Sequence, residues 1–104
     1  MLLYNLLKLK IIMGIVRKHV RFTGRVQGVN FRYTSSNYAN KFGLTGWVRN
    51  DYDGSVEMEV QGTPELINRL FETMKNVSSY IVIDNIEQKT IPTISDETGF
   101  NIRY

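Results

Sequence analysis

A chain of 104 residues with a net charge of +3 is long enough for one domain with a single core and too short for two. Hydrophobic residues make up 42% and charged residues 22%, which is typical of a globular domain and not of a disordered chain. The absence of cysteine excludes a disulfide scaffold, a thiolate metal site and a cysteine nucleophile, and it favours a reducing, cytoplasmic setting.

The first 14 residues form a leader, MLLYNLLKLKIIMG, whose apolar run is interrupted by Asn5, Lys8 and Lys10. This run is too short and too broken to span a bilayer, and its charges do not precede the apolar stretch as in a secretory signal. We expect residues 1–14 to be disordered or to lie upstream of a natural start at Met13. Residues 15–104 then form a single domain.

Two segments at the start of this domain show clear hydrophobic periodicity. Residues 15–24 alternate between apolar and polar side chains, which predicts a half-buried strand. Its polar face carries Arg17, His19, Arg21 and Thr23, which we expect to be solvated. Residues 31–42 repeat apolar or small side chains at helical spacing, and a glycine follows where a left-handed residue ends a helix.

A β-hairpin and a second helix are predicted next. Residues 44–50 and 55–62 read as strands on either side of the turn DYDG at residues 51–54. Residues 64–77 carry one apolar face, and Thr63 is well placed as the N-cap because a proline and a glutamate follow it in the first turn.

Two strands close the chain, over residues 80–88 and 100–104, with a turn-rich stretch between them. The element order is therefore β-α-β-β-α-β with a further terminal strand. This order predicts an α+β protein with a ferredoxin-like sandwich, in which two helices cover one face of an antiparallel sheet with a short fifth strand.

The usual catalytic groups do not gather in this sequence. His19 is the single histidine and has no second histidine or cysteine with which to bind a metal, so we interpret it as a surface strand residue. Asp51 and Asp53 bracket the hairpin turn and are interpreted as turn formers. Glu57 and Glu59 lie on the polar face of a strand, where we expect them to be solvated. The sequence therefore lacks the standard groups for covalent or metal catalysis.

One loop does suggest chemistry. The stretch GRVQGVNFR at residues 24–32 places two glycines between a strand and a predicted helix. Backbone amides in such a loop can converge on an anion, and the N-terminus of the following helix adds further N–H groups. Arg32 would add a guanidinium fork that matches a phosphate. A tight connection that merely needs glycines remains the alternative, because two glycines and an arginine are a weak signal.

Several motifs together resemble the acylphosphatases. GRVQGVNFR is followed by GWVRN at residues 46–50 and by DGSVE at residues 53–57 in the family's order, and the resemblance runs from about Ile15 to the closing GFNIRY. It implies a ferredoxin-like enzyme that hydrolyses acylphosphates to a carboxylate and inorganic phosphate without metal or cofactor.

The resemblance also implies the residues that act. The backbone loop that binds the substrate phosphate falls on Gly24, Arg25, Val26, Gln27, Gly28, Val29 and Asn30. The essential arginine falls on Arg32, which would hold the phosphate, and the essential asparagine on Asn50, whose carboxamide would orient the attacking water. The implied partners are a small acylphosphate and inorganic phosphate as a competitive ligand. We expect a monomer that binds neither nucleic acid nor membrane.

Two other classes stay open. The RNA-recognition module shares this topology, but its sheet should carry exposed aromatic residues, whereas Glu57 and Glu59 stand on the polar face here. A catalytically idle or regulatory copy of the fold is the second, because acylphosphatase-like domains also occur within larger proteins that mature metalloenzymes. The presence of Arg32 and Asn50 argues against an idle copy.

Overall fold

The computed structural model describes residues 14–104. The expectations for the leader lie outside these residues, except for Gly14. The elements are β1 (Val16–Arg25), α2 (Phe31–Lys41), β2 (Thr45–Asn50), β3 (Val56–Gly62), α3 (Pro64–Asn76), β4 (Val82–Ile91) and β5 (Phe100–Ile102). Their order is the predicted one, and only the end of β4 differs from its predicted position by more than two residues.

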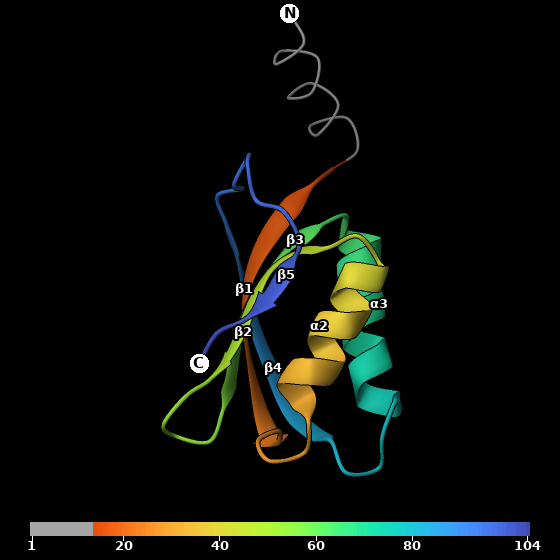
Figure 1. Cartoon of the computed structure of the whole chain (residues 1–104), viewed down its shortest axis with the longest axis vertical. Helices are drawn as coiled ribbons and strands as arrows, with labels where there is room; N and C mark the ends of the chain where they lie inside the picture. Colours follow the sequence, from red (N-terminus) through yellow and green to blue (C-terminus); the bar gives the residue numbers. More distant parts are fainter. Residues whose placement is uncertain (1–13) are drawn as a thin grey trace, which may run out of the picture.

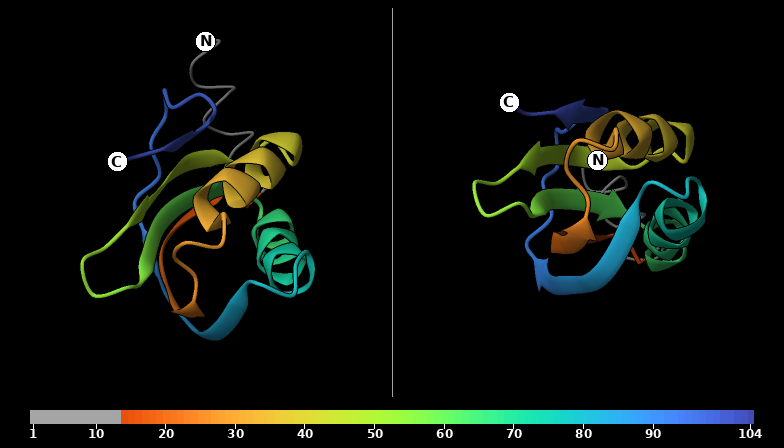
Figure 2. Two further views of the ribbon diagram at one scale, coloured as in Figure 1. Left: turned by 60° about the horizontal axis from the view of Figure 1, so that its bottom comes forward. Right: turned by 90° about the horizontal axis from the view of Figure 1, so that it is seen from below.

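The strands form one sheet with the order β4-β1-β3-β2-β5. The first four strands pair antiparallel, and the short β5 joins the edge of β2 in parallel, so that the sheet is mixed. Figures 1 and 2 show both helices on the same face of this sheet. The predicted α+β, ferredoxin-like class is confirmed.

The core lies between the helices and the covered face of the sheet. β1 contributes Val20 and Phe22, which are fully buried as their alternation predicted. The ring of Phe22 packs against those of Phe31 from α2 and Phe71 from α3, with centroids 5.0 and 5.6 Å apart. Because both helices meet the sheet at these rings, the start of α2 is held in place by the core.

The N-terminus of α3 is formed as the sequence predicted. The amide of Leu66 donates to the Thr63 hydroxyl at 3.3 Å, and a proline and Glu65 occupy the first turn. α2 ends as expected too, because Gly43 adopts a φ of 71° just beyond the helix.

β5 is only three residues long and depends on α2 for its position. The side chain of Asn40 accepts from the Phe100 amide at 2.8 Å and donates to the Phe100 carbonyl at 3.0 Å. The amide of Arg103 then donates to Val48 O of β2 at 2.8 Å. These bonds fix the chain that follows β5 beside the end of β2.

The open face of the sheet is not the solvated surface that alternation suggested. Arg17 is 1% exposed, because the segment between β4 and β5 folds over it. Its guanidinium donates to Glu97 at 2.7 Å, to Glu59 at 2.9 Å and to Gln61 at 3.3 Å. The expectation that Arg17 is solvated is therefore wrong. Strand periodicity reports only which face a residue occupies, and a distant segment decides whether that face is covered.

The two glutamates of β3 are likewise half-buried rather than solvated. Glu57 accepts from the guanidinium of Arg49 and contacts His19 Nε2 at 2.6 Å, and Glu59 accepts from Arg17. Burial alone would raise the pKa of Glu57, but the hydrogen bonds from His19 and Arg49 outweigh it and hold this pKa below its usual value. Both carboxylates serve the ion pairs of the sheet.

Candidate active site

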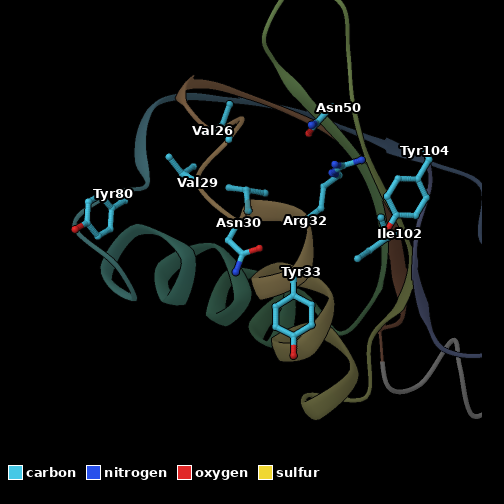
Figure 3. Close-up of a pocket in the computed structure, with 11 residues that line it drawn as sticks. Val26, Val29, Asn30, Arg32, Tyr33, Asn50, Tyr80, Ile102 and Tyr104 are labelled. Carbon is cyan, nitrogen blue, oxygen red and sulfur yellow. The ribbon is translucent and has the colours of Figure 1, made fainter.

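A pocket of about 880 Å³ opens where the loop after β1, the start of α2, the end of β2 and the chain after β5 meet (Figure 3). It brings together six of the predicted site residues: Val26, Gly28, Val29, Asn30, Arg32 and Asn50. Gly24, Arg25 and Gln27 do not line it. The loop that sequence reasoning treated as one unit therefore divides into a part that faces the pocket and a part that supports it.

The part that faces the pocket offers free backbone amides. Gly28 and Asn30 both adopt the left-handed conformation, with φ of 74° and 69°. The amides of Gly28 and Val29 have no hydrogen-bond partner within residues 14–104. Asn30 is the N-cap of α2, yet its side chain makes no capping bond, and the first turn of α2 contains no acidic residue. The N–H groups of this turn thus face the pocket without a counter-charge.

Arg32 supplies the positive charge of the pocket. It lies in the first turn of α2, and Figure 3 shows its guanidinium reaching toward the end of β2, where Asn50 lies. No carboxylate of the described chain forms an ion pair with Arg32. Its guanidinium lies over the ring of Tyr104, 4.9 Å from the centroid. Stacking orients the fork and leaves its N–H groups free.

Asn50 supplies a neutral polar group on the other side of the pocket. It is the last residue of β2 and stands opposite Val56 of β3. Within the described residues, its Oδ1 is the one buried side-chain nitrogen or oxygen without a hydrogen-bond partner. A buried acceptor in this state is a costly exception to the rule that such groups are paired. This carboxamide is therefore suited to hold a water molecule or a substrate group.

The side chain of Gln27 connects the loop to the β2–β3 turn by hydrogen bonds. Its Nε2 donates to the carbonyls of Asp51 and Ser55 at 2.7 and 2.8 Å. Both carbonyls belong to the turn that directly follows Asn50, so the glutamine fixes the loop relative to the asparagine. The spacing of the sequence gives no signal for this contact, because it joins residues 24 positions apart.

Gly24 and Arg25 belong to the strand rather than to the pocket. Gly24 has a φ of 127° at a β-bulge, and a Cβ there would overlap the carbonyl of Val82 in β4. Arg25 is exposed and pairs with Val82 at the end of β1. Gly24 therefore allows the edge strand β4 to lie close to β1, and only Gly28, the second glycine of the motif, faces the pocket.

Five residues that line the pocket were not predicted from the sequence as site residues: Phe31, Tyr33, Tyr80, Ile102 and Tyr104. In the sequence, Ile102 and Tyr104 alternate with Asn101 and Arg103, which places both on one side of the last predicted strand. This pattern alone does not predict that the two residues line the pocket, because that also requires β5 to lie beside β2 and next to the helix that carries Arg32.

The remaining candidates lie away from the pocket. His19 contacts Glu57 on the open face of the sheet. Asp53 accepts from the hydroxyl of Ser55 at 2.6 Å and from its amide at 3.0 Å; these bonds, with the charge of Arg21, hold the pKa of Asp53 below its usual value. Asp51 and Asp53 are thus turn formers, as interpreted. The described residues contain no group of three histidine, cysteine or acidic side chains that could bind a metal.

The RNA-recognition alternative is not supported by the open face of the sheet. On the central strands β1 and β3, this face carries Arg17, His19, Glu57 and Glu59 in place of aromatic residues. Bases would have no ring on which to stack there.

The fold and the pocket together define a class: a small α+β protein whose loop and helix N-terminus present amides and an arginine that have no partner of opposite charge among residues 14–104. The acylphosphatase family model matches residues 18–102. An acylphosphatase from Bifidobacterium longum is 41% identical over 92 residues, which cover 86% of this chain and 94% of that protein. The crystal structure of acylphosphatase from Bacillus subtilis has a TM-score of 0.78 at 32% identity, covering 86% of this chain and 99% of that one.

A larger protein contains a similar unit. The crystal structure of full-length HypF in a phosphate- and nucleotide-bound form has a TM-score of 0.73 at 29% identity, and the match covers 86% of this chain but 12% of that one. The chain belongs to the acylphosphatase family, whose members are hydrolases that act on acid anhydrides.

Proposed function

We propose that this protein hydrolyses the carboxyl–phosphate bond of acylphosphates. Water attacks phosphorus, the bond from phosphorus to the acyl oxygen breaks, and the products are a carboxylate and inorganic phosphate. Two residues of one pocket carry the proposal. Among the described residues, Arg32 has no carboxylate partner, and the buried Oδ1 of Asn50 accepts no hydrogen bond.

The residues that line the pocket include no serine, cysteine, histidine or carboxylate, and this reaction needs no nucleophile from the protein because water attacks phosphorus directly. An acylphosphate is a mixed anhydride with a stable carboxylate leaving group, so its hydrolysis asks little of a general base. Catalysis of phosphoryl transfer rests mainly on positioning and on stabilising the charge of the equatorial oxygens. The proton of the attacking water can pass to a phosphate oxygen of the substrate itself.

The phosphate is held by two kinds of donor. The amides of Gly28 and Val29 and the first turn of α2 surround its oxygens, and Arg32 adds a charged, bidentate contact. Because these donors are fixed by Gln27 and by the core before the substrate arrives, they need little reorganisation during the reaction.

Asn50 orients the attacking water. Its carboxamide offers one acceptor and two N–H groups. A neutral amide tolerates the nearby phosphate, whereas a carboxylate in the same position would repel it. The buried Oδ1 accepts a hydrogen bond from the water and aims the lone pair of the water oxygen at phosphorus.

We also propose that inorganic phosphate competes with the substrate and that the protein acts as a cytoplasmic monomer. Phosphate carries the same anionic group for which the loop provides donors. The lack of cysteine fits a reducing compartment, and one core accounts for the buried apolar residues. No helix within residues 14–104 is long and apolar enough to cross a membrane.

Hydrolysis of benzoyl phosphate, measured with and without inorganic phosphate, tests this function. We expect turnover that phosphate inhibits competitively and that a chelator leaves unchanged. A protein that binds phosphate but does not hydrolyse benzoyl or acetyl phosphate would instead be an idle copy of the fold, and the proposed activity would be wrong.

A further inference from the structure

We propose that this site selects acylphosphates whose acyl group is neutral and apolar, and that Val29, Tyr33 and Tyr80 form the surface that binds this group. The inference rests on the proposed hydrolysis of acylphosphates and concerns the part of the substrate that the phosphate contacts leave undefined. It is carried by three features of the pocket: its charge, its exposed rings and the position of Asn50.

The pocket can neutralise only one anionic group. Arg32 is the single charged side chain among the residues that line it, and the proposed mechanism places this guanidinium on the phosphate. Two other arginines lie at the ends of nearby strands but do not line the pocket. Arg25 is exposed at the end of β1, and the guanidinium of Arg103 lies over the ring of Trp47 at 4.4 Å. A second carboxylate or phosphate on the acyl group would therefore find no cation.

Four of the seven lining residues outside the phosphate loop are aromatic. Tyr33 of α2 and Tyr80 before β4 are 58% and 71% exposed, although both are large rings beside a pocket. An exposed ring next to a binding site gains by covering an apolar ligand, because burying apolar surface is favourable and rings add stacking contacts. Within residues 14–104 the side chain of Tyr33 makes no hydrogen bond or ion pair, and its only hydrogen bonds are those of its backbone, such as the one from the Ser36 hydroxyl to its carbonyl at 3.0 Å. Its ring is therefore free to contact a ligand.

In-line attack decides which side of the pocket receives the acyl group. The attacking and leaving oxygens stand on opposite sides of phosphorus. Asn50 holds the water, so the acyl oxygen leaves on the side remote from Asn50. Figure 3 shows Val29 and Tyr80 on the side of the loop away from Asn50, and Tyr33 beyond the start of α2, whereas Tyr104 lies beside Arg32. The acyl group therefore extends over Val29 and the two tyrosines, and Tyr104 orients the guanidinium.

A matched pair of substrates tests the charge preference. Butanoyl phosphate and succinyl phosphate have acyl chains of four carbons and differ in that the second ends in a carboxylate. We expect kcat/KM for butanoyl phosphate to be higher by about tenfold or more, with most of the difference in KM. Equal values, or a preference for succinyl phosphate, would overturn the inference.

Substitutions test the surface itself. Tyr33→Ala and Tyr80→Ala should each lower the ratio of kcat/KM for benzoyl over acetyl phosphate by about threefold to tenfold, because only the larger group reaches the rings. Tyr33→Phe keeps the ring and should keep the ratio. Tyr52→Ala is the matched control, since this tyrosine is fully exposed in the turn after β2 and does not line the pocket.

The outcomes separate this inference from the function on which it rests. An unchanged ratio in both alanine variants, with acetyl phosphate still hydrolysed, would overturn the aromatic surface and leave the hydrolase intact. Failure of the unmodified protein to hydrolyse any of the four acylphosphates would overturn both. A fall in the benzoyl-to-acetyl ratio with Tyr52→Ala as large as with Tyr33→Ala would overturn the aromatic surface alone, because the effect would then not be local to the pocket.

Discussion

Arg17 and Arg32 show what an arginine does when it has partners and when it has none. Arg17 is buried under the segment between β4 and β5, and two carboxylates and Gln61 accept its hydrogen bonds. Arg32 lies at the pocket without a carboxylate partner in the described chain and stacks on Tyr104. The first is a structural cation, and the second keeps its N–H groups available for an anion.

This difference follows from where the acidic residues lie. Glu57, Glu59 and Glu97 all stand on the open face of the sheet, whereas the first turn of α2 contains no acidic residue. Charge on the open face is therefore neutralised within the protein, and charge at the pocket is left for the ligand. Substitutions at the two sites should separate stability from activity.

The largest effect is expected from Arg32→Ala. Loss of a positioned arginine in phosphoryl transfer reduces turnover by roughly 10³-fold or more, and phosphate inhibition should disappear with it. The free energy of unfolding should change by about 1 kcal/mol or less, because only the stacking on Tyr104 is lost. Arg32→Lys should restore little, since an ammonium lacks the bidentate fork. Turnover above a tenth of normal in the alanine variant, measured with benzoyl phosphate, would contradict this role.

Arg17→Ala should lower stability and leave activity unchanged. It leaves Glu59 and Glu97 half-buried and without their cation, which should lower the free energy of unfolding by about 3 kcal/mol in urea denaturation. The KM for benzoyl phosphate should not change while the protein is folded. Arg21→Ala is the control, because its ion pair with Asp53 is largely exposed and should contribute much less to the free energy of unfolding. Equal losses in both variants would show that burial of Arg17 is not what matters.

Asn50→Ala should reduce kcat by roughly 10²-fold, as expected for the loss of one positioned polar group. The inhibition constant for phosphate should stay within about twofold, because the donors of the loop and Arg32 remain. Asn50→Asp provides the contrast, since a carboxylate at this position should weaken phosphate binding as well. If Asn50→Ala turns over at the normal rate, the asparagine does not orient the water.

The smallest effect is expected from Glu97→Gln. Burial would raise the pKa of Glu97, but hydrogen bonds from Arg17 and Thr45 and the charge of Arg17 hold it below the ordinary value of 4.5. A carboxylate with a lowered pKa stabilises the fold above pH 4.5, and this contribution disappears as the pH falls through the lowered pKa. The variant should therefore be less stable at neutral pH by about 1–3 kcal/mol. In denaturation curves, the difference in free energy of unfolding between the variant and the unmodified protein should become smaller below pH 4.5. A difference that stays constant with pH would exclude the Arg17–Glu97 ion pair as its cause.

The sequence was most informative where structure is local. The Thr63 cap, the glycine after α2 and the turn at Asp51 and Asp53 were predicted because each depends on a few adjacent residues. The burial of Arg17 was not predicted, because Glu97 lies 80 residues away and covers a face that periodicity marks only as polar.

The candidate site shows the same difference between local features and contacts between distant residues. The resemblance to the family implied the loop, Arg32 and Asn50, whereas the contacts of Gln27 with the hairpin turn and the tyrosines around the pocket depend on how distant elements pack. The two glycines of the motif looked equivalent, yet Gly24 accommodates β4 and Gly28 faces the pocket. Only tertiary structure separates them.

Titration of the protein with inorganic phosphate, followed by amide NMR, tests the central claim most directly. We predict saturable shifts of the Gly28 and Val29 amides and of the first turn of α2, no comparable shifts on the open face around Arg17, and loss of the response in Arg32→Ala. Phosphate shifts that spare the loop amides, or that persist unchanged in Arg32→Ala, would contradict the account.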